Sequence, residues 1–166
     1  MNKKIYNTDK DTIRGFMDHF LNLAMEQLIE NGCVPPVMVF YNWDAMGNGK
    51  REFMALNFSD DIEKQASIAT AKVKMAMDQV DAYVFVSEAW VKIVPNGDKL
   101  PQGKAVREMD GKREALIVTG ASPHFCLSLS QPFNRIDDFP AFEFEEEIFS
   151  DRADTHWNPD HWRFKN

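Results

Sequence analysis

The stretch 82–94, AYVFVSEAWVKIV, constrains the fold most, because it has the pattern of an apolar strand with a carboxylate, Glu88, in its middle. Side chains alternate across a strand, so Glu88 shares a face with Val86 and Trp90. Both faces are largely apolar, which predicts a strand in the interior of a sheet covered on at least one side. A carboxylate at such a place must be paired, solvated at a cleft, or protonated.

The composition predicts one domain over residues 1–150 and an irregular tail, 151–166, packed on or beside it. The chain has 166 residues, is 44% hydrophobic and contains 13 Phe and 4 Trp, which is enough to build a hydrophobic core. Its net charge of −7 makes nucleic acid an unfavourable partner, because phosphate binding needs clustered Lys and Arg.

Compartment and membrane signals all favour the cytoplasm. No run of about 18 apolar residues is present, so no transmembrane helix is expected. The two lysines near the start, in MNKKIYNTDKDT, are not followed by the apolar segment of a secretory signal. Two cysteines, Cys33 and Cys126, are too few and too far apart for a disulfide framework.

Apolar periodicity and turn residues predict the order helix, two strands, helix, three strands. The helices are expected at 12–30 and 59–80, and the strands at 37–43, 51–58, 82–94, 113–119 and 125–131. The segment 95–111 is expected to be a polar loop, and the stretch from residue 139 a sixth strand or a short acidic helix. In the second helix the buried stripe is expected to comprise Ile62, Ala66, Ala69, Val73, Ala76, Met77 and Val80.

This order predicts an α+β fold with a mainly antiparallel sheet of five or six strands and helices packed on it. The order of elements is similar to that of the roadblock and profilin-like folds. In sequence, FVSEAW at 85–90 and KREAL at 112–116 resemble a family of uncharacterised small proteins of bacteria and phages. The resemblance covers about a third of the chain, chiefly 83–118, and implies no activity.

Glu88 supports two hypotheses. It could act as the general base of a hydrolase, together with Asp44 or His124. It could instead be a structural carboxylate paired with Arg113 or Arg107, a role that ion-pair networks often give to buried carboxylates.

The sequence gives weaker support to other kinds of functional site. No HxH, HExxH or CxxC pattern accompanies the histidines, so no metal is expected; no cofactor motif is present either. GNGK at 47–50 is explained by a hairpin turn, because a phosphate loop would lead into a helix. The acidic cluster Glu143, Glu145, Glu146 and Glu147 leaves open an inhibitor that imitates nucleic acid.

We therefore predict a small, non-enzymatic binding domain that contacts a protein partner or a second copy of itself as a homodimer. Aromatic residues exceed the needs of one small core, and exposed aromatic side chains often anchor interfaces. The predicted binding residues are Trp90, Arg113, Glu114, Trp157 and Trp162. The hydrolase using Glu88 and the acidic inhibitor remain as alternatives.

Overall fold

A computed structural model describes residues 9–44, 46, 48–92, 103, 105–142, 148–150 and 162. Within these residues, two α-helices, a short 3₁₀-helix and seven strands follow in chain order. Their bounds are α1 Lys10–Asn31, β1 Val37–Trp43, β2 Gly49–Ala55, α2 Asp61–Met77, β3 Ala82–Val91, η1 Val106–Glu108, β4 Arg113–Ser122, β5 Phe125–Ile136, β6 Phe139–Phe142 and β7 Ile148–Ser150.

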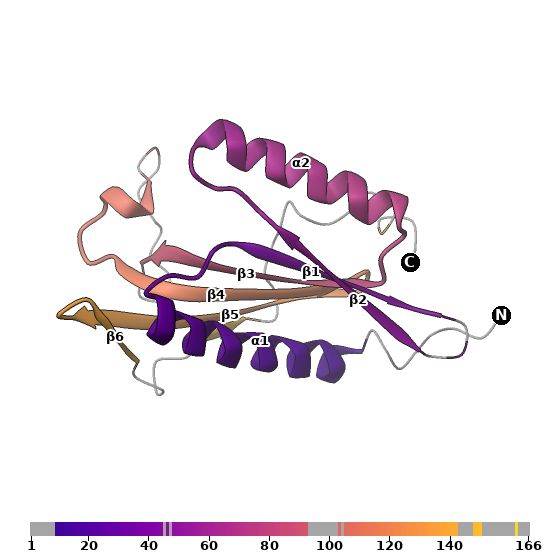
Figure 1. Cartoon of the computed structure of the whole chain (residues 1–166), viewed down its shortest axis with the longest axis horizontal. Helices are drawn as coiled ribbons and strands as arrows, with labels where there is room; N and C mark the ends of the chain where they lie inside the picture. The colour runs from indigo at the N-terminus through magenta and orange to yellow at the C-terminus, as the bar shows by residue number, and fades with distance from the viewer. Residues whose placement is uncertain are drawn as a thin grey trace.

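The strands form one antiparallel sheet in the order β2-β1-β3-β4-β5-β6, and β7 pairs with β5 beside β6. The two helices cover opposite faces of this sheet, α1 below it and α2 above it in Figure 1. The α+β, antiparallel class predicted from the sequence is confirmed. The strand carrying Glu88 is β3, which lies between β1 and β4 in the interior of the sheet as predicted.

Helix α1 was expected over 12–30, and its observed ends lie within two residues of those bounds. The side chain of Asp9 accepts a hydrogen bond from the backbone N–H of Thr12 at 2.7 Å, and Gly32 ends the helix with a φ of 77°, a conformation that glycine adopts without strain. The helix packs against β4 at Gly120, where an added Cβ would lie only 2.5 Å from the sulfur of Met17. The absence of a side chain at Gly120 therefore lets α1 approach the sheet closely.

Helix α2 was expected over 59–80 and is shorter, and the Asp60 side chain caps its start by accepting from the N–H of Glu63 at 2.8 Å. Its predicted buried stripe is wrong. The helix turns Ile68, Ala71 and Met75 toward the sheet, and of the seven residues expected in the stripe only Val80, beyond the helix end, is buried. The other six, Ile62, Ala66, Ala69, Val73, Ala76 and Met77, face solvent.

The second half of the chain extends the sheet further than the sequence indicated. Strand β5 continues through Pro132 to Ile136, and β6 and β7 both pair with it. Of the predicted polar loop 95–111, residue 103 and residues 105–111 are described; they include η1 and the buried Met109. The predicted tail, 151–166, lies outside the described residues except for Trp162.

Candidate functional site

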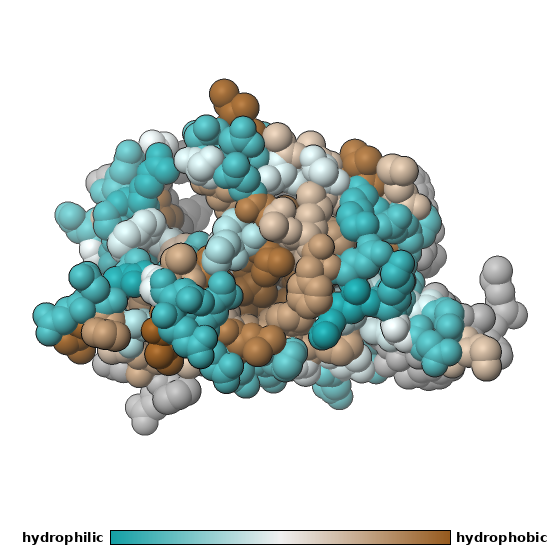
Figure 2. Space-filling view, in the orientation of Figure 1, coloured by the Kyte–Doolittle hydropathy of each residue, from teal (hydrophilic) through white to brown (hydrophobic). Residues whose placement is uncertain are grey.

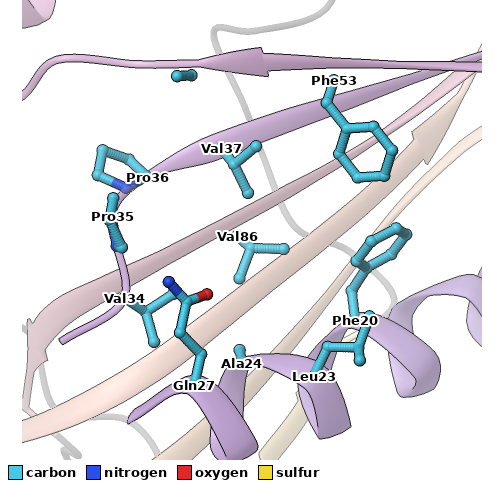
Figure 3. Close-up of a pocket in the computed structure, with 11 residues that line it drawn as sticks. Phe20, Leu23, Ala24, Gln27, Val34, Pro35, Pro36, Val37, Phe53 and Val86 are labelled. Atoms are coloured by element: carbon cyan, nitrogen blue, oxygen red, sulfur yellow. The ribbon is translucent and has the colours of Figure 1, made fainter. Parts of the chain in front are cut away.

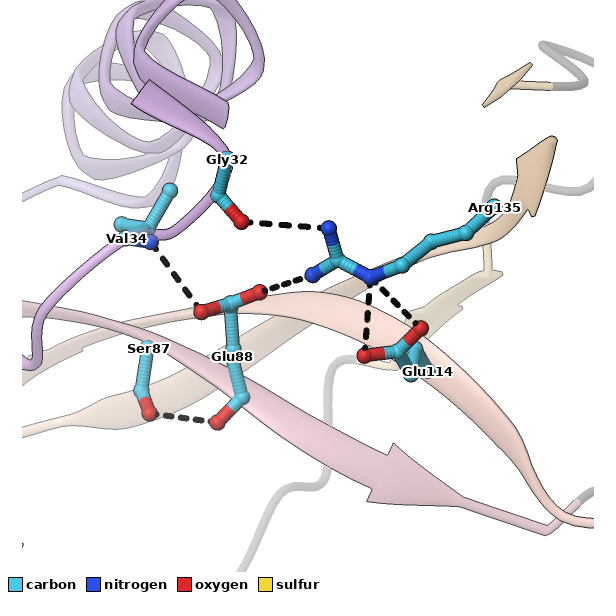
Figure 4. A network of polar contacts seen from close by, with 6 residues as sticks. All are labelled: Gly32, Val34, Ser87, Glu88, Glu114 and Arg135. Carbon is cyan, nitrogen blue, oxygen red and sulfur yellow. Dashed lines mark hydrogen bonds and ion pairs between the residues drawn. The ribbon is translucent and has the colours of Figure 1, made fainter. Parts of the chain in front are cut away.

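Glu88 is held in a network of polar contacts, and its side chain lines a cavity of about 280 Å³ together with Trp90, Glu114 and Arg135. One carboxylate oxygen accepts from Nη2 of Arg135 at 3.1 Å, and the other accepts from the backbone N–H of Val34 at 3.1 Å. The Nε of Arg135 also donates to both carboxylate oxygens of Glu114, at 3.0 and 3.3 Å. Its Nη1 donates to the carbonyl oxygen of Gly32 at 3.1 Å. Figure 4 shows the guanidinium surrounded by these three acceptors.

This network ties the end of α1 to three neighbouring strands. Glu88 lies on β3, Glu114 on β4 and Arg135 on β5, and their side chains share the sheet face on which α1 packs. Arg135 binds the carbonyl of the residue that caps α1, at the negative end of the helix dipole. The carboxylate of Glu88 is thus paired, which favours the structural hypothesis. Its expected partners were wrong, because Arg135 and not Arg113 or Arg107 makes the ion pair.

The other two residues of the hydrolase hypothesis lie far from Glu88. Asp44 accepts from the backbone N–H groups of Met46 and Asn48, both at 2.9 Å, and so closes the turn between β1 and β2. His124 lies in the turn between β4 and β5. Strand register places both turns near Ala82, at the opposite end of β3. Glu88 is six residues further along, roughly 20 Å away at the rise of a strand.

Of the predicted binding residues, Trp90 and Glu114 lie opposite each other on β3 and β4 and line the same cavity, whereas Trp162 lies at the other end of β3. Trp90 is 45% exposed and lies under the Lys112 ammonium, 5.1 Å from its ring centre. Trp162 is buried instead; it stacks on Tyr83 and donates from Nε1 to the carbonyl of Val80 at 3.0 Å. Arg113 contacts Asn134 at 3.5 Å, while Glu114 belongs to the network described above. Trp157 lies outside the described residues.

An apolar groove of about 360 Å³ lies between α1 and the β1–β2 hairpin. Figure 2 shows apolar side chains gathered in a hollow in the middle of this face. In Figure 3 the rings of Phe20, from α1, and Phe53, from β2, lie next to each other at one end of the groove, with their centres 6.0 Å apart. The groove is lined by Phe20, Leu23, Ala24, Gln27, Val34, Pro35, Pro36, Val37, Phe53, Ala55 and Val86.

The groove exists because α1 leaves part of its sheet face uncovered. The helix packs chiefly on β4 and β3, whereas the corresponding face of β1 and β2 extends beyond it. The network around Glu88 positions one end of the groove. It binds the backbone of Gly32 and Val34, and the chain continues from there directly into Pro35 and Pro36, which line the groove. Phe53 is consequently 57% exposed and Leu23 is 43% exposed, although both are large apolar residues.

Strand β2, beside the groove, has no paired strand on its outer edge among the described residues. The N–H of Asp44 donates to the carbonyl of Asn48, and that of Leu56 to the carbonyl of Pro36, both at 3.0 Å. Antiparallel ladders alternate between hydrogen-bonded and non-hydrogen-bonded pairs, so the even-numbered residues of β2 bond to β1. The backbone N–H and C=O groups of Arg51 and Phe53 therefore point away from β1, at the outer edge of the sheet beside the groove.

Arg51 marks the far end of the groove. Its guanidinium lies 5.2 Å from the ring centre of Phe53 and 6.0 Å from that of Phe20. No carboxylate in the described part of the chain pairs with it. Beneath it, the buried hydroxyl of Tyr41 lies close to the guanidinium of Arg51. Burial raises the pKa of Tyr41 to about 12, and the nearby charge of Arg51 opposes that rise.

On the other face of β2, Glu52 connects the edge strand to α2. Its carboxylate pairs with Lys74 of α2 at 2.7 Å and with Lys50 at 2.9 Å. Hydrogen bonds from Lys74 and then Lys50 lower the pKa of Glu52 to about 2. The edge strand is thus anchored from one face while its outer backbone groups and the groove stay accessible.

Within the described residues, no three His, Cys, Asp or Glu side chains converge in a way that could hold a metal ion. Neither described helix combines the length and the hydropathy needed to span a bilayer. The groove itself was not anticipated from the sequence. The available signals were Pro35-Pro36 and the apolar residues of the second strand, Phe53 to Leu56, which indicated only a strand that is at least partly buried.

Comparison with known proteins gave no match to a family model, a curated protein or a solved structure. The resemblance of the segments at 85–90 and 112–116 to small bacterial and phage proteins therefore stays a prediction. Any proposal of function rests on the groove, the open strand edge and the network around Glu88.

Proposed function

We propose that this chain is a small, non-enzymatic interaction domain that binds an extended segment of a partner protein along the outer edge of β2. The observation that carries the proposal is the open edge beside an apolar groove. An added strand would pair with the outward backbone groups of Arg51 and Phe53, and alternate side chains would enter the groove. This is the mode of β-strand addition, in which backbone hydrogen bonds supply affinity and pockets supply specificity.

The chemistry of the groove defines the partner segment. The lining beside Phe53 favours an aliphatic or aromatic side chain, because nearly all of the lining residues are apolar. Arg51 at the far end favours a carboxylate, since it has no acidic partner in the described part of the chain. The bound segment therefore carries one large apolar residue and, two residues away on the same face, an Asp or Glu.

The paired state of Glu88 supports a binding domain over a hydrolase, because a carboxylate engaged by Arg135 and Val34 is committed to the fold. We further propose that the domain works in the cytoplasm. Support comes from Cys33 and Cys126, which do not form a disulfide, and from the resemblance to small bacterial and phage proteins.

Backbone amide exchange in the presence of synthetic peptides tests the proposal. The probes are seven-residue peptides of alternating Thr and Val with Phe at the centre, with or without Glu two residues after Phe. Binding should slow exchange at the amides of Arg51 and Phe53. The amides of Lys50, Glu52 and Met54 should change little, because they already bond to β1. The peptide with Glu should bind more tightly.

Two variants give the matched comparison. Arg51→Pro removes one outward N–H without removing a bond to β1 and should abolish peptide binding. Val73→Glu, on the exposed face of α2, should leave it unchanged. The proposal fails if no peptide slows exchange at Arg51 and Phe53 at millimolar concentration, or if Arg51→Pro folds and binds as well as the parent.

A further inference from the structure

Helix α2 carries a second apolar stripe on the face opposite the sheet. Ile62 is 81% exposed, Val73 is 58% exposed and Met77 is 78% exposed, and Ala66, Ala69 and Ala76 between them are exposed as well. At 100° per residue these six positions lie on the side opposite Ile68, Ala71 and Met75, which face the sheet. The solvent face of a helix is normally polar, and the described part of the chain gives this outer stripe no packing role.

The spacing of the outer stripe is that of a helix–helix seam. Positions 62, 66, 69, 73 and 76 follow steps of four and three residues, the heptad spacing that keeps apolar residues on one contact line. The alanines at the centre of the stripe allow a second helix to approach closely. The larger side chains, Ile62 and Met77, stand at its two ends.

This arrangement of sizes is complementary to itself when a second α2 runs antiparallel. A two-fold axis at Ala69 would place Ala69 opposite its own copy. Ile62 would then meet Ala76 and Met77 of the second copy, and Val73 would meet Ala66. Each large side chain thus faces a small one or the end of the contact, without a steric conflict along the seam.

The helix dipoles give the same orientation. The first turn of α2 is acidic, with Asp61 and Glu63, whereas Lys74 near its end already pairs with Glu52 and Asp78, at 2.7 and 2.8 Å. Side-chain charge therefore does not decide between the two orientations. Antiparallel helix dipoles, however, attract one another, whereas parallel dipoles repel.

We propose that two copies of this chain associate through the outer stripe of α2, with the helices antiparallel and a two-fold axis at Ala69. The contact is limited to one helix of 17 residues, about 25 Å long. A contact of this size belongs to the small, transient class, so the dimer forms with a dissociation constant on the order of tens of micromolar. This site lies on a different face from the groove and does not depend on peptide binding there.

Sedimentation equilibrium between about 5 µM and 1 mM measures the association. Val73→Glu should weaken dimerisation at least about 30-fold, because it places a carboxylate in the seam. The matched control is Ile29→Glu, which changes an apolar residue of α1 that is also 55% exposed; it should leave the dimer unchanged. Circular dichroism confirms that both variants fold.

Disulfide trapping tests the orientation. In a background with Cys33→Ser and Cys126→Ser, Ala69→Cys lies on the proposed axis and should cross-link rapidly to its copy. Ile62→Cys should not, because its copy would lie roughly 20 Å away along the antiparallel pair.

Three results would overturn the proposal. The first is a protein that remains monomeric up to 1 mM. The second is a dimer that Val73→Glu leaves intact, above all one that Phe53→Ala dissociates, which would place the contact at the groove. The third is efficient cross-linking of Ile62→Cys, which would require parallel helices.

Discussion

Replacing Glu88 by Gln tests whether its carboxylate serves the fold. The side chains of Glu88 and Arg135 are 27% and 28% exposed, so the contribution of their ion pair to stability lies between the values for exposed and for buried pairs. Exposed pairs contribute up to about 1 kcal/mol, and breaking a fully buried pair costs about 3–5 kcal/mol. Gln keeps the shape and can still accept from the N–H of Val34. We therefore expect Glu88→Gln to lower the free energy of unfolding by about 1–2 kcal/mol, the range of one charge-assisted hydrogen bond.

Removing the other partner should cost more. Arg135→Met loses the bonds to Glu88, Glu114 and Gly32, and it leaves two carboxylates side by side without a cation. We expect a loss of about 2–4 kcal/mol. In that background Glu88→Gln should stabilise the protein, since it removes one of two repelling charges. The double-mutant cycle should thus give a coupling energy of about 2 kcal/mol.

Urea unfolding at pH 7 measures all four proteins, and equal slopes against urea show that the comparison is valid. Asp18→Asn is the control, because Asp18 forms an exposed ion pair with Arg14 on α1 and should change stability by less than about 1 kcal/mol. If Glu88→Gln is more stable than the parent, the structural reasoning is refuted. Glu88 would then be a strained functional carboxylate of the kind that active sites retain.

Three further outcomes follow from the packing and the ion pairs. Ala71→Phe, on the buried face of α2, should lower the free energy of unfolding by about 1–3 kcal/mol. Ala69→Phe should change it by less than about 0.5 kcal/mol in dilute protein. The midpoints of urea unfolding of the two variants test this difference. Gly120→Ala should cost about 1–3 kcal/mol because its Cβ would crowd Met17, and an unchanged midpoint would contradict close packing there. The Glu52 pKa falls from 4.5 to about 2 on folding, so its contribution is complete above pH 4.5 and lost as the pH falls through about 2. The thermal midpoint of Glu52→Gln should therefore depend less on pH across that window than the midpoint of the parent.

Local signals in the sequence predicted the elements well. A helix that starts at Asp9 and ends at Gly32 needs a capping carboxylate and a residue that tolerates positive φ, and both are visible in the sequence. The same holds for the capping of α2 by Asp60. The position of β3 inside the sheet also followed from its sequence, because a strand that is apolar on both faces must be covered by neighbours.

The burial of α2 could not be predicted in the same way. Ile62, Ala66, Ala69 and Val73 recur at helical spacing, but so do Ile68, Ala71 and Met75. Periodicity shows that a helix has an apolar face and does not show which of two such faces meets the sheet. That choice depends on tertiary contacts, such as the ion pair between Lys74 and Glu52.

The partner of Glu88 was missed because of Pro132. A proline normally marks the end of a strand, so the fifth strand was expected to stop at Gln131. In the structure Pro132 pairs with Ala115 of β4. On the opposite edge of β5, residues 128–130 pair with β7 and residues 133–136 pair with β6, and Pro132 lies between these two stretches. The strand continues, and Arg135 reaches the carboxylates of Glu88 and Glu114.

The two proposed contacts lie on different surfaces, and together they have a consequence for affinity. A dimer through α2 presents two copies of the β2 edge, so a partner with two extended segments can bind both at once. The second binding step is then intramolecular, and affinity rises without any new contact if the linker spans the two edges. A tandem peptide with a long flexible linker should bind the dimer at least about tenfold more tightly than the single peptide. Val73→Glu should remove this gain while leaving the affinity for the single peptide unchanged. Equal affinities for tandem and single peptides, measured where the dimer is fully formed and with a series of linker lengths, would show that the two edges do not act together.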